Sequence, residues 1–550
     1  MLNTVSRRDA ILLLLGASSF YLFSAFVPES QDPSSIFNAG QTSVLLPAPA
    51  TEYGSSAPTQ ATAPVDLGLV QIFPETTVVA HAPGWTIFQN LYMSGGALLL
   101  LTSDPSKFPE HRFMTSTGLP GNLTNDAQRQ PTARDMAFVT PEEARSRWGG
   151  DISSGERHRV RTVEGTTLLL NDPPQFLKHY FHFVAELMFG SWAFLYGAFV
   201  DGLVHPPSSP ASDPSIEPSF TPPLLSNTTP TIDRAIFIHS DAEGWRDLPG
   251  FNAYFLRAVF PSMTVEVSID WQDRINATSN PEIGRAVHFP LVLLTDRSAA
   301  FRSPICGGYT QRTAAPAWDT MARLGKVDLI GNWWSSMRAG LLRYAGGDPH
   351  EELQSTLDFP QKIVITYINR QGTRRHLRDE DDSALIAAVE GLVEKKNREG
   401  RNWEFNNVHA ERLSRDEQIK YAAKTTILLG VHGNGLTHLV FMKPNLVSAV
   451  VEIFLPGGYA RDYEWTSRSL GMTHYSVWND TSFTHPNEPK IPGYPDGFHG
   501  PNIPVQGSFV ANLIEKHVAA REQGISANNS PAHDIYNRRR SWVHPLKVHG

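Results

Sequence analysis

The fold is decided by an apolar run that leads into a glycine-rich turn, TILLGVHGNGLTH, at residues 426–438. The pattern predicts a strand over 426–429 and a short helix from Leu436 onward. At the carboxyl end of a strand, free N–H groups and the dipole of the following helix favour an anion, and glycine lets the backbone approach a pyrophosphate closely. We interpret this turn as an anion site. A tight strand–helix turn that holds no ligand is the alternative.

Strands and helices alternate on both sides of this turn. The apolar patterns predict strands at 362–368, 403–408, 447–454 and 474–477, and helices from Asp382 onward, over 414–424 and over 464–470. Strict alternation with short connections is typical of a doubly wound parallel sheet, which binds its ligand at the carboxyl ends of the strands.

The first half of the chain predicts a second α/β unit. We expect strands at 167–170, 235–239, 264–269 and 291–295, and helices at 176–199 and 251–259. The predicted fold class is therefore α/β, with two Rossmann-like domains that face a cleft.

The N-terminal segment predicts membrane attachment. Arg7 and Arg8 precede an apolar run at 10–27, and a polar exit follows at Pro28. This order is typical of a signal anchor with a cytosolic tail. A signal peptide cleaved near Ser24 is the alternative.

The chain as a whole then divides into six predicted parts. They are a cytosolic tail (1–9), a transmembrane signal anchor (10–27), a flexible stem (28–70), an N-terminal α/β acceptor-side domain (71–345) with a disordered insertion (205–231), a C-terminal Rossmann-like nucleotide-binding domain (346–520) and a C-terminal tail (521–550).

Charge, glycosylation sequons and cysteine content limit which compartment and which partners are expected for the protein. The net charge of -8 argues against a nucleic-acid partner. Glycosylation sequons occur at Asn122, Asn227, Asn276, Asn479 and Asn528, and Cys306 is the single cysteine, so no internal disulfide can form. We expect a single-pass type II protein of the Golgi or endoplasmic reticulum membrane, with its catalytic part in the lumen.

A basic loop follows the predicted strand 362–368. Its cationic residues are Arg370, Arg374, Arg375, His376 and Arg378. Arg370 is nearest to the strand end and is predicted to bind a diphosphate, because guanidinium groups contact phosphate in bidentate fashion. Arg375 and Arg378 are expected to pair with the acidic run 379–382. That run is interpreted as a helix start rather than a metal site, and no metal is predicted.

Polar residues interrupt the apolar helix predicted at 176–199. His179, His182 and Glu186 share one face of it. We predict Glu186 as general base, with its pKa raised by burial, and His182 as the residue that orients it or the acceptor. A metal site of two histidines and one glutamate, or a buried structural pair, are the alternatives.

These motifs together resemble glycosyltransferase family 61. The similar blocks are YFHFVAE at 180–186, TYINR at 366–370, residues 430–442 and VEIF at 451–454, within a resemblance that covers roughly 168–478. This chain has Asn434 where family members often carry alanine, and Glu186 where some carry aspartate.

The resemblance implies an inverting transferase of GT-B architecture that takes a UDP-sugar as co-substrate and requires no other cofactor. Because the family includes N-acetylglucosaminyltransferases and plant xylosyltransferases, transfer of N-acetylglucosamine or xylose to a protein or glycan acceptor is expected. The predicted catalytic residues are Glu186 and His182, and the predicted donor-binding residues are Arg370, His432, Gly433, Asn434, Gly435, His438 and Glu452.

Two other classes of protein stay open at this point. One is a catalytically silent glycan- or nucleotide-binding protein on the same fold. The other is a nicotinamide oxidoreductase, because Glu452 follows Gly435 by 17 residues, near the spacing at which an acidic residue holds the ribose.

Overall fold

The computed structural model describes residues 73–121, 124–149, 159–200, 229–306, 312–348 and 359–527, which all belong to one compact unit. The predicted cytosolic tail, anchor and stem lie outside these residues, as do nearly all of the insertion and Asn122, Asn227 and Asn528. In the part of the chain that the structure describes, no helix is both long and apolar enough to cross a membrane.

The C-terminal sheet confirms the predicted parallel architecture. Its strand order is β11-β10-β12-β13-β14-β15, in which the first five strands are parallel and β15 is an antiparallel edge strand that the sequence did not predict. The strands are β10 (Ile363–Ile368), β11 (Trp403–Val408), β12 (Ile427–Val431), β13 (Ala449–Ile453), β14 (Thr473–Trp478) and β15 (Thr481–Phe483). The strand order reverses between β10 and β12, and open α/β sheets bind ligands at such a point, outside the carboxyl ends of the strands.

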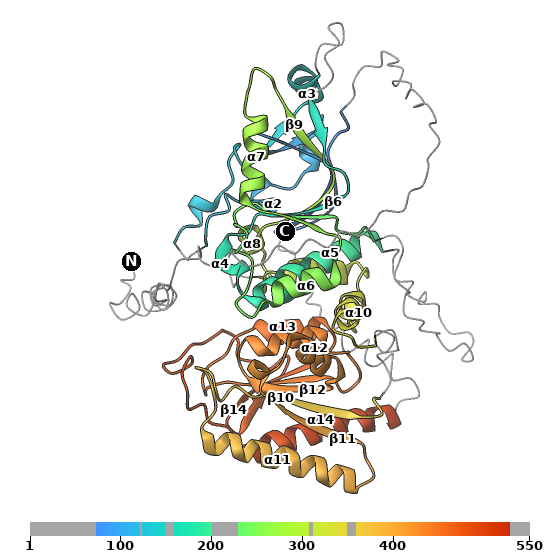
Figure 1. Ribbon diagram of the computed structural model, residues 1–550, viewed down its shortest axis with the longest axis vertical. Coiled ribbons are helices and arrows are strands. Elements are labelled where there is room, and N and C mark those ends of the chain that lie inside the picture. Colours follow the sequence, from blue (N-terminus) through green and yellow to red (C-terminus); the bar gives the residue numbers. More distant parts are fainter. Residues whose placement is uncertain are drawn as a thin grey trace, which may run out of the picture. The chain divides into compact units, whose positions relative to one another are not determined.

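Helices cover both faces of this sheet (Figure 1). One face packs on α11 (Asp379–Arg398) and α14 (Gly507–Ala527), and the other on α12 (Arg415–Lys424) and α13 (Asp462–Ser469). The α14 helix continues past residue 520 into the segment predicted as a C-terminal tail. The acidic run 379–382 lies in the first turn of α11, as predicted, and the buried Asp382 accepts a hydrogen bond from the Tyr367 hydroxyl at 2.7 Å.

The first sheet is mixed rather than purely Rossmann-like. Strands β9, β6, β7 and β8 are parallel neighbours as predicted, but β2 pairs antiparallel with β9, and β1 and β3 pair antiparallel with β2. The strands are β1 (Thr77–Ala82), β2 (Trp85–Ser94), β3 (Ala97–Leu101), β4 (Met136–Val139), β5 (Val160–Thr162), β6 (Thr166–Leu170), β7 (Arg234–Phe237), β8 (Thr264–Glu266) and β9 (Ala286–Thr295).

The remaining helices are short. The α-helices are α2 (His111–Met114), α3 (Pro141–Trp148), α4 (Pro174–Leu177), α5 (Phe189–Phe199), α6 (Phe251–Val259), α7 (Ser268–Thr278), α8 (Arg297–Ala300), α9 (Ala315–Arg323) and α10 (Ser335–Tyr344). The 3₁₀ helices are η1 (Pro105–Lys107), η2 (Ala127–Arg129), η6 (Asn332–Trp334), η8 (Ala410–Arg412) and η9 (Asn434–Phe441).

The helix predicted at 176–199 is divided into three parts. After α4, a π-helix, η4 (Phe181–Met188), leads directly into α5. Every residue of η4 except His182 is buried, which agrees with the predicted apolar character. A π-helical segment is wider than an α-helix and occurs frequently at functional sites.

Residues near both sheets share one apolar core. The Phe189 ring lies 4.7 Å from that of Trp333 and 6.0 Å from that of Trp465 on α13. The Trp334 indole donates to the Val440 carbonyl at 2.8 Å. This packing brings η4 and α5 against η9 and α13, so residues far apart in the sequence can build one site.

Candidate functional site

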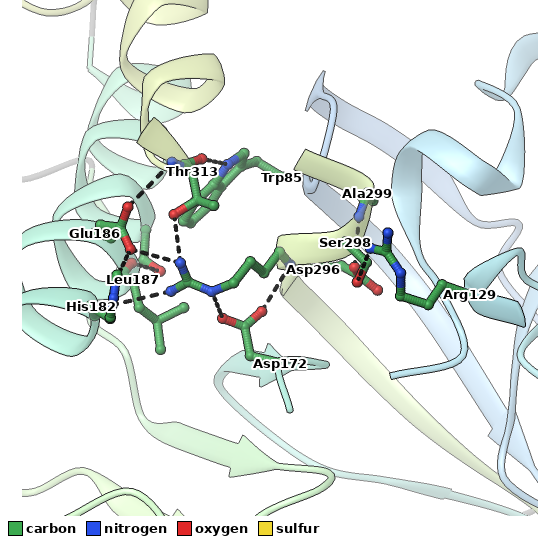
Figure 2. Close-up of polar contacts among 12 residues, drawn as sticks. Trp85, Arg129, Asp172, His182, Glu186, Leu187, Asp296, Ser298, Ala299 and Thr313 are labelled. Carbon is green, nitrogen blue, oxygen red and sulfur yellow. Dashed lines mark hydrogen bonds and ion pairs between the residues drawn. The ribbon is translucent and has the colours of Figure 1, made fainter. Parts of the chain in front are cut away.

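Three charged side chains, Asp172, Glu186 and Arg297, meet with His182 at the carboxyl ends of β6 and β9. Asp172 follows β6 and Arg297 follows β9, and these strands are parallel neighbours. The Arg297 Nε atom lies 3.2 Å from an Asp172 carboxylate oxygen, and its Nη1 lies 2.6 Å from an oxygen of Glu186. Figure 2 shows these contacts, with His182 and Thr313 on the other sides of Glu186. The guanidinium therefore links the sheet to the π-helix.

The Glu186 carboxylate is buried and makes three hydrogen bonds within the protein. It accepts from His182 Nδ1 at 2.5 Å, from Arg297 at 2.6 Å and from the Thr313 backbone N–H at 3.5 Å, and it is 1% exposed. Burial alone would raise its pKa, but the positive charge of Arg297 and the contact with His182 outweigh burial, and the pKa is lowered. The predicted raised pKa was therefore wrong, because the sequence did not reveal Arg297 as a partner.

His182 is the member of this group that solvent reaches. Its side chain is 18% exposed, and its Nε2 makes no hydrogen bond to any described residue. Because an ionised carboxylate only accepts, Nδ1 carries a proton, and in the neutral ring Nε2 then presents a lone pair. The neighbouring His179 ring lies 4.9 Å away, and burial and His182 lower its pKa to about 3, so it stays neutral. The chemistry available here is proton acceptance at His182 Nε2, with Glu186 in support.

Two arginines hold the glycine turn at the strand-order reversal. Arg370 donates to the His432 carbonyl at 2.7 Å, and Arg375 donates to the same carbonyl at 2.9 Å. Gly433 has φ +152°, and a Cβ there would overlap the Arg370 guanidinium, so glycine is required for this approach. A Cβ at Gly435 would lie 2.8 Å from Ile368.

The role expected for Arg375 was wrong. It was predicted to pair with the acidic run 379–382, but its guanidinium binds the turn and lies over the Phe498 ring at 5.3 Å. Burial and Arg370 lower its pKa to about 10, so it remains a cation at neutral pH. Arg374 and Arg378 are exposed on the same loop.

A buried network lies behind the turn. His432 Nδ1 is 2.5 Å from one Glu452 oxygen, and His474 Nε2 is 2.8 Å from the other. Burial raises the pKa of Glu452 well above its usual value, and burial with Arg375 and Arg370 lowers that of His432. A protonated Glu452 would donate to His432 Nδ1 and leave Nε2–H as a donor, whereas an ionised Glu452 would leave Nε2 as an acceptor.

His438 does not point to a ligand as predicted. Its Nδ1 lies 3.1 Å from the Tyr180 hydroxyl and its Nε2 lies 2.9 Å from the Gln418 side-chain oxygen, so both ring nitrogens are used within the protein. The Asn434 side-chain oxygen accepts from the Phe181 backbone N–H at 3.3 Å. These two contacts attach the turn to the start of η4, one residue before His182. The predicted catalytic and donor-binding groups are thus brought together.

Sequence reasoning missed Asp172, Arg297 and His474. Asp172 and Arg297 each follow a strand that had been predicted, at 167–170 and 291–295. The rule that singled out Arg370, a charged residue directly after a strand in a parallel sheet, would have found both of them. His474 carried no such signal, because it lies within a strand.

One group of described residues has the spacing for a metal ion. Ligand atoms of Glu464, His485 and Glu488 lie within 4.8 Å of one another. Arg468 donates to Glu464 at 2.8 Å, so that carboxylate already faces a cation. The electrostatics therefore favour an ion-pair cluster over a metal centre at this place.

Two predicted glycosylation sites can be located. Asn276 is exposed on α7, where its side-chain oxygen accepts from Gln272 at 3.0 Å. Asn479 occupies the tight turn between β14 and β15 with φ +52°. Their modification stays a prediction.

Comparison with known proteins gives two matches. Residues 180–451 match the model of the family Glycosyltransferase 61. The EGF domain-specific O-linked N-acetylglucosamine transferase of Drosophila melanogaster is 30% identical over 131 residues, which are 23% of this chain and 22% of that protein. The aligned segment thus spans about a fifth of that relative. The matches support the predicted enzyme class, a glycosyltransferase, and residues 180–451 are similar to glycosyltransferase family 61.

Proposed function

We propose that this protein is an inverting glycosyltransferase that transfers a sugar from a UDP-sugar to a protein or glycan acceptor, on a GT-B layout. The observation that carries the proposal is the convergence of Arg370 and Arg375 on the His432 carbonyl, at the reversal of strand order in the C-terminal sheet. Two guanidinium groups beside a glycine turn suit a diphosphate.

In this proposal the transfer is one displacement. The acceptor oxygen attacks the anomeric carbon as the bond to the UDP oxygen breaks, and the acceptor proton moves to His182 Nε2. Glu186 holds the tautomer of His182 and stabilises the imidazolium that forms, and Arg297 keeps Glu186 ionised. The negative charge that develops on UDP is stabilised by Arg370 and Arg375, so the UDP-sugar needs no separate cofactor.

The sugar proposed is N-acetylglucosamine or xylose. The relative from Drosophila melanogaster is named as an O-linked N-acetylglucosamine transferase, which supports the first of these. We further propose that the predicted anchor at 10–27 holds the protein in the Golgi or endoplasmic reticulum membrane with its catalytic part in the lumen.

A panel of UDP-sugars offered to the purified full chain tests the proposal. Calorimetry should show binding of UDP and of at least one UDP-sugar, and slow release of UDP should identify the preferred sugar. The Arg370→Ala variant should weaken this binding about 10- to 100-fold, whereas Arg374→Ala, which alters an exposed arginine on the same loop, should keep it. Failure of the wild-type chain to bind any UDP-sugar would refute the proposal.

One observation favours a second candidate, a silent glycan- or nucleotide-binding protein. The carboxylate predicted as general base is buried and hydrogen-bonded to His182 and Arg297. In that case UDP-sugars would bind without turnover in the presence of any acceptor, and His182→Asn would change nothing that can be measured.

A further inference from the structure

The segment 484–506, between β15 and α14, runs back along the carboxyl ends of the C-terminal strands. Near its end, Val505 pairs with Asn479 at the β14–β15 turn, and Ile503 pairs with Leu377 on the loop that follows β10. The Ile503 carbonyl accepts from the Arg378 N–H at 3.1 Å, and its N–H donates to the His376 carbonyl at 3.1 Å. The segment is therefore fixed against the loop that carries Arg370 and Arg375.

Aromatic rings of this segment extend outward from the glycine turn. Phe498 is buried, and its ring lies 5.5 Å from that of His432 and 5.0 Å from that of Tyr494. The His499 ring lies 6.1 Å from the Tyr494 ring, with the two planes 13° apart. Arg375 Nη2 lies 3.1 Å from His499 Nδ1. One arginine thus contacts both the turn and the outer aromatic pair.

The Tyr494 ring is unusual in being exposed at this place. It is 51% exposed although its edge packs on the buried Phe498, and His499 beside it is also exposed. Leaving a large ring in water forgoes the free energy of burying it. An exposed tyrosine ring stacked on an exposed histidine ring, beside two guanidinium groups, has the chemistry that binds a nucleobase joined to a diphosphate.

We propose that Tyr494 and His499 form a stacking platform for the nucleobase of the donor nucleoside diphosphate. This inference rests on the proposed function, because it takes the diphosphate to lie at Arg370 and Arg375. Phe498 packs on the Tyr494 ring and holds it in place. The hydrogen bond between Arg375 and His499 fixes the distance between the two stacking rings and the diphosphate. A sugar unit of the acceptor is the other ligand that could stack on these rings.

The stacking platform is tested by comparing how tightly the protein and its variants bind UDP and inorganic pyrophosphate. Calorimetry on the full chain should show that Tyr494→Ala weakens UDP about 5- to 100-fold, the worth of one base on one aromatic ring, and leaves pyrophosphate unchanged. Tyr494→Phe keeps the ring and should bind UDP like wild type. Tyr344→Ala removes a comparably exposed tyrosine from α10 and should change neither ligand.

Two results would overturn the platform. The first is an unchanged UDP affinity in Tyr494→Ala. This result would show that the ring does not bind the nucleobase and would leave a sugar unit of the acceptor as its ligand. The second is an equal loss for UDP and pyrophosphate, which would show a general disturbance of the loop. Failure of the wild-type chain to bind either ligand would instead refute the proposed function, so the two failures are distinguishable.

Discussion

His182 Nδ1 lies 2.5 Å from a Glu186 carboxylate oxygen that also accepts from Arg297. The arginine makes this pair differ from His432 and Glu452, which have the same 2.5 Å contact, but whose carboxylate receives no hydrogen bond from an arginine or lysine among the described residues. Glu186 is therefore held ionised, with a lowered pKa, whereas burial raises the pKa of Glu452. A histidine and a glutamate thus have different effects at the two places. Ionised Glu186 fixes the tautomer of His182, whereas burial disfavours the charged forms of Glu452 and His432.

Replacing Glu186 by glutamine should lower kcat at least about 100-fold and leave the Kd of UDP within about twofold, because the change removes support for a proton acceptor and no donor contact. Steady-state kinetics and calorimetry measure the two effects. The double variant His182→Asn/Glu186→Gln should be no slower than His182→Asn alone, since the two side chains act as one unit. Additive losses would contradict this assignment.

Replacing Arg297 by methionine should destabilise the protein by about 3–5 kcal/mol, because Asp172 and Glu186 would be left buried without their shared cation. Urea denaturation followed by fluorescence measures the free energy of unfolding. Arg147→Met breaks a surface pair with Glu143 and should cost less than about 1 kcal/mol. If both variants lost the same free energy of unfolding, burial of the Arg297 network would add nothing to the stability of the protein.

Replacing Arg370 or Arg375 by alanine should raise the donor KM about 10- to 100-fold, the worth of one charge-assisted hydrogen bond. In addition, kcat should decrease, because the negative charge on UDP grows during transfer and the missing guanidinium no longer stabilises it. Arg374→Ala is the matched control, with an expected KM close to that of the wild type. A KM effect at Arg374 as large as that at Arg370 would indicate general attraction by the basic loop.

The stability contributed by His438 should depend on pH. Burial lowers its pKa to about 4 from an ordinary value near 6.5. In acid the unfolded chain binds a proton that the folded chain does not, so stability is present above pH 6.5 and is lost as the pH falls toward 4. His438→Gln should therefore cost less at pH 5 than at pH 7.5. Parallel stability curves for the two proteins across this range would contradict the pKa shift.

The C-terminal fold was readable because each strand there is a short apolar run bounded by a helix with its own start signal. Strand β11 has the predicted bounds, and Ser414 and Glu417 form the predicted capping box of α12. The N-terminal strands β1 to β4 were missed. Their clearest signal is Gly95-Gly96, which has positive φ at both residues and closes a two-residue hairpin between β2 and β3.

The sequence predicted which residues belong to the candidate site better than it predicted what each residue does there. Burial, which the sequence does indicate, correctly placed Glu186 inside the protein, but the sign of its pKa shift depends on Arg297, 111 residues away in the chain. His438 was assigned to a ligand because its partners, Tyr180 and Gln418, come from separate elements. Long-range pairing of this kind leaves no local pattern in a single sequence.

The π-helix 181–188 makes the spacing of residues here as important as their identity. Removing one residue from it without moving α4 or α5 would restore ordinary α-helical winding, and a one-residue shift turns a helix by about 100°. With the residue removed between them, His182 would lie three positions before the glutamate instead of four, on the same face of the helix but turned by about 100°, so the contact between the two side chains would change. Chains that keep the same motif with one residue fewer before the glutamate should therefore hold this pair in a different geometry, and deletions should be tolerated less well in this segment than substitutions.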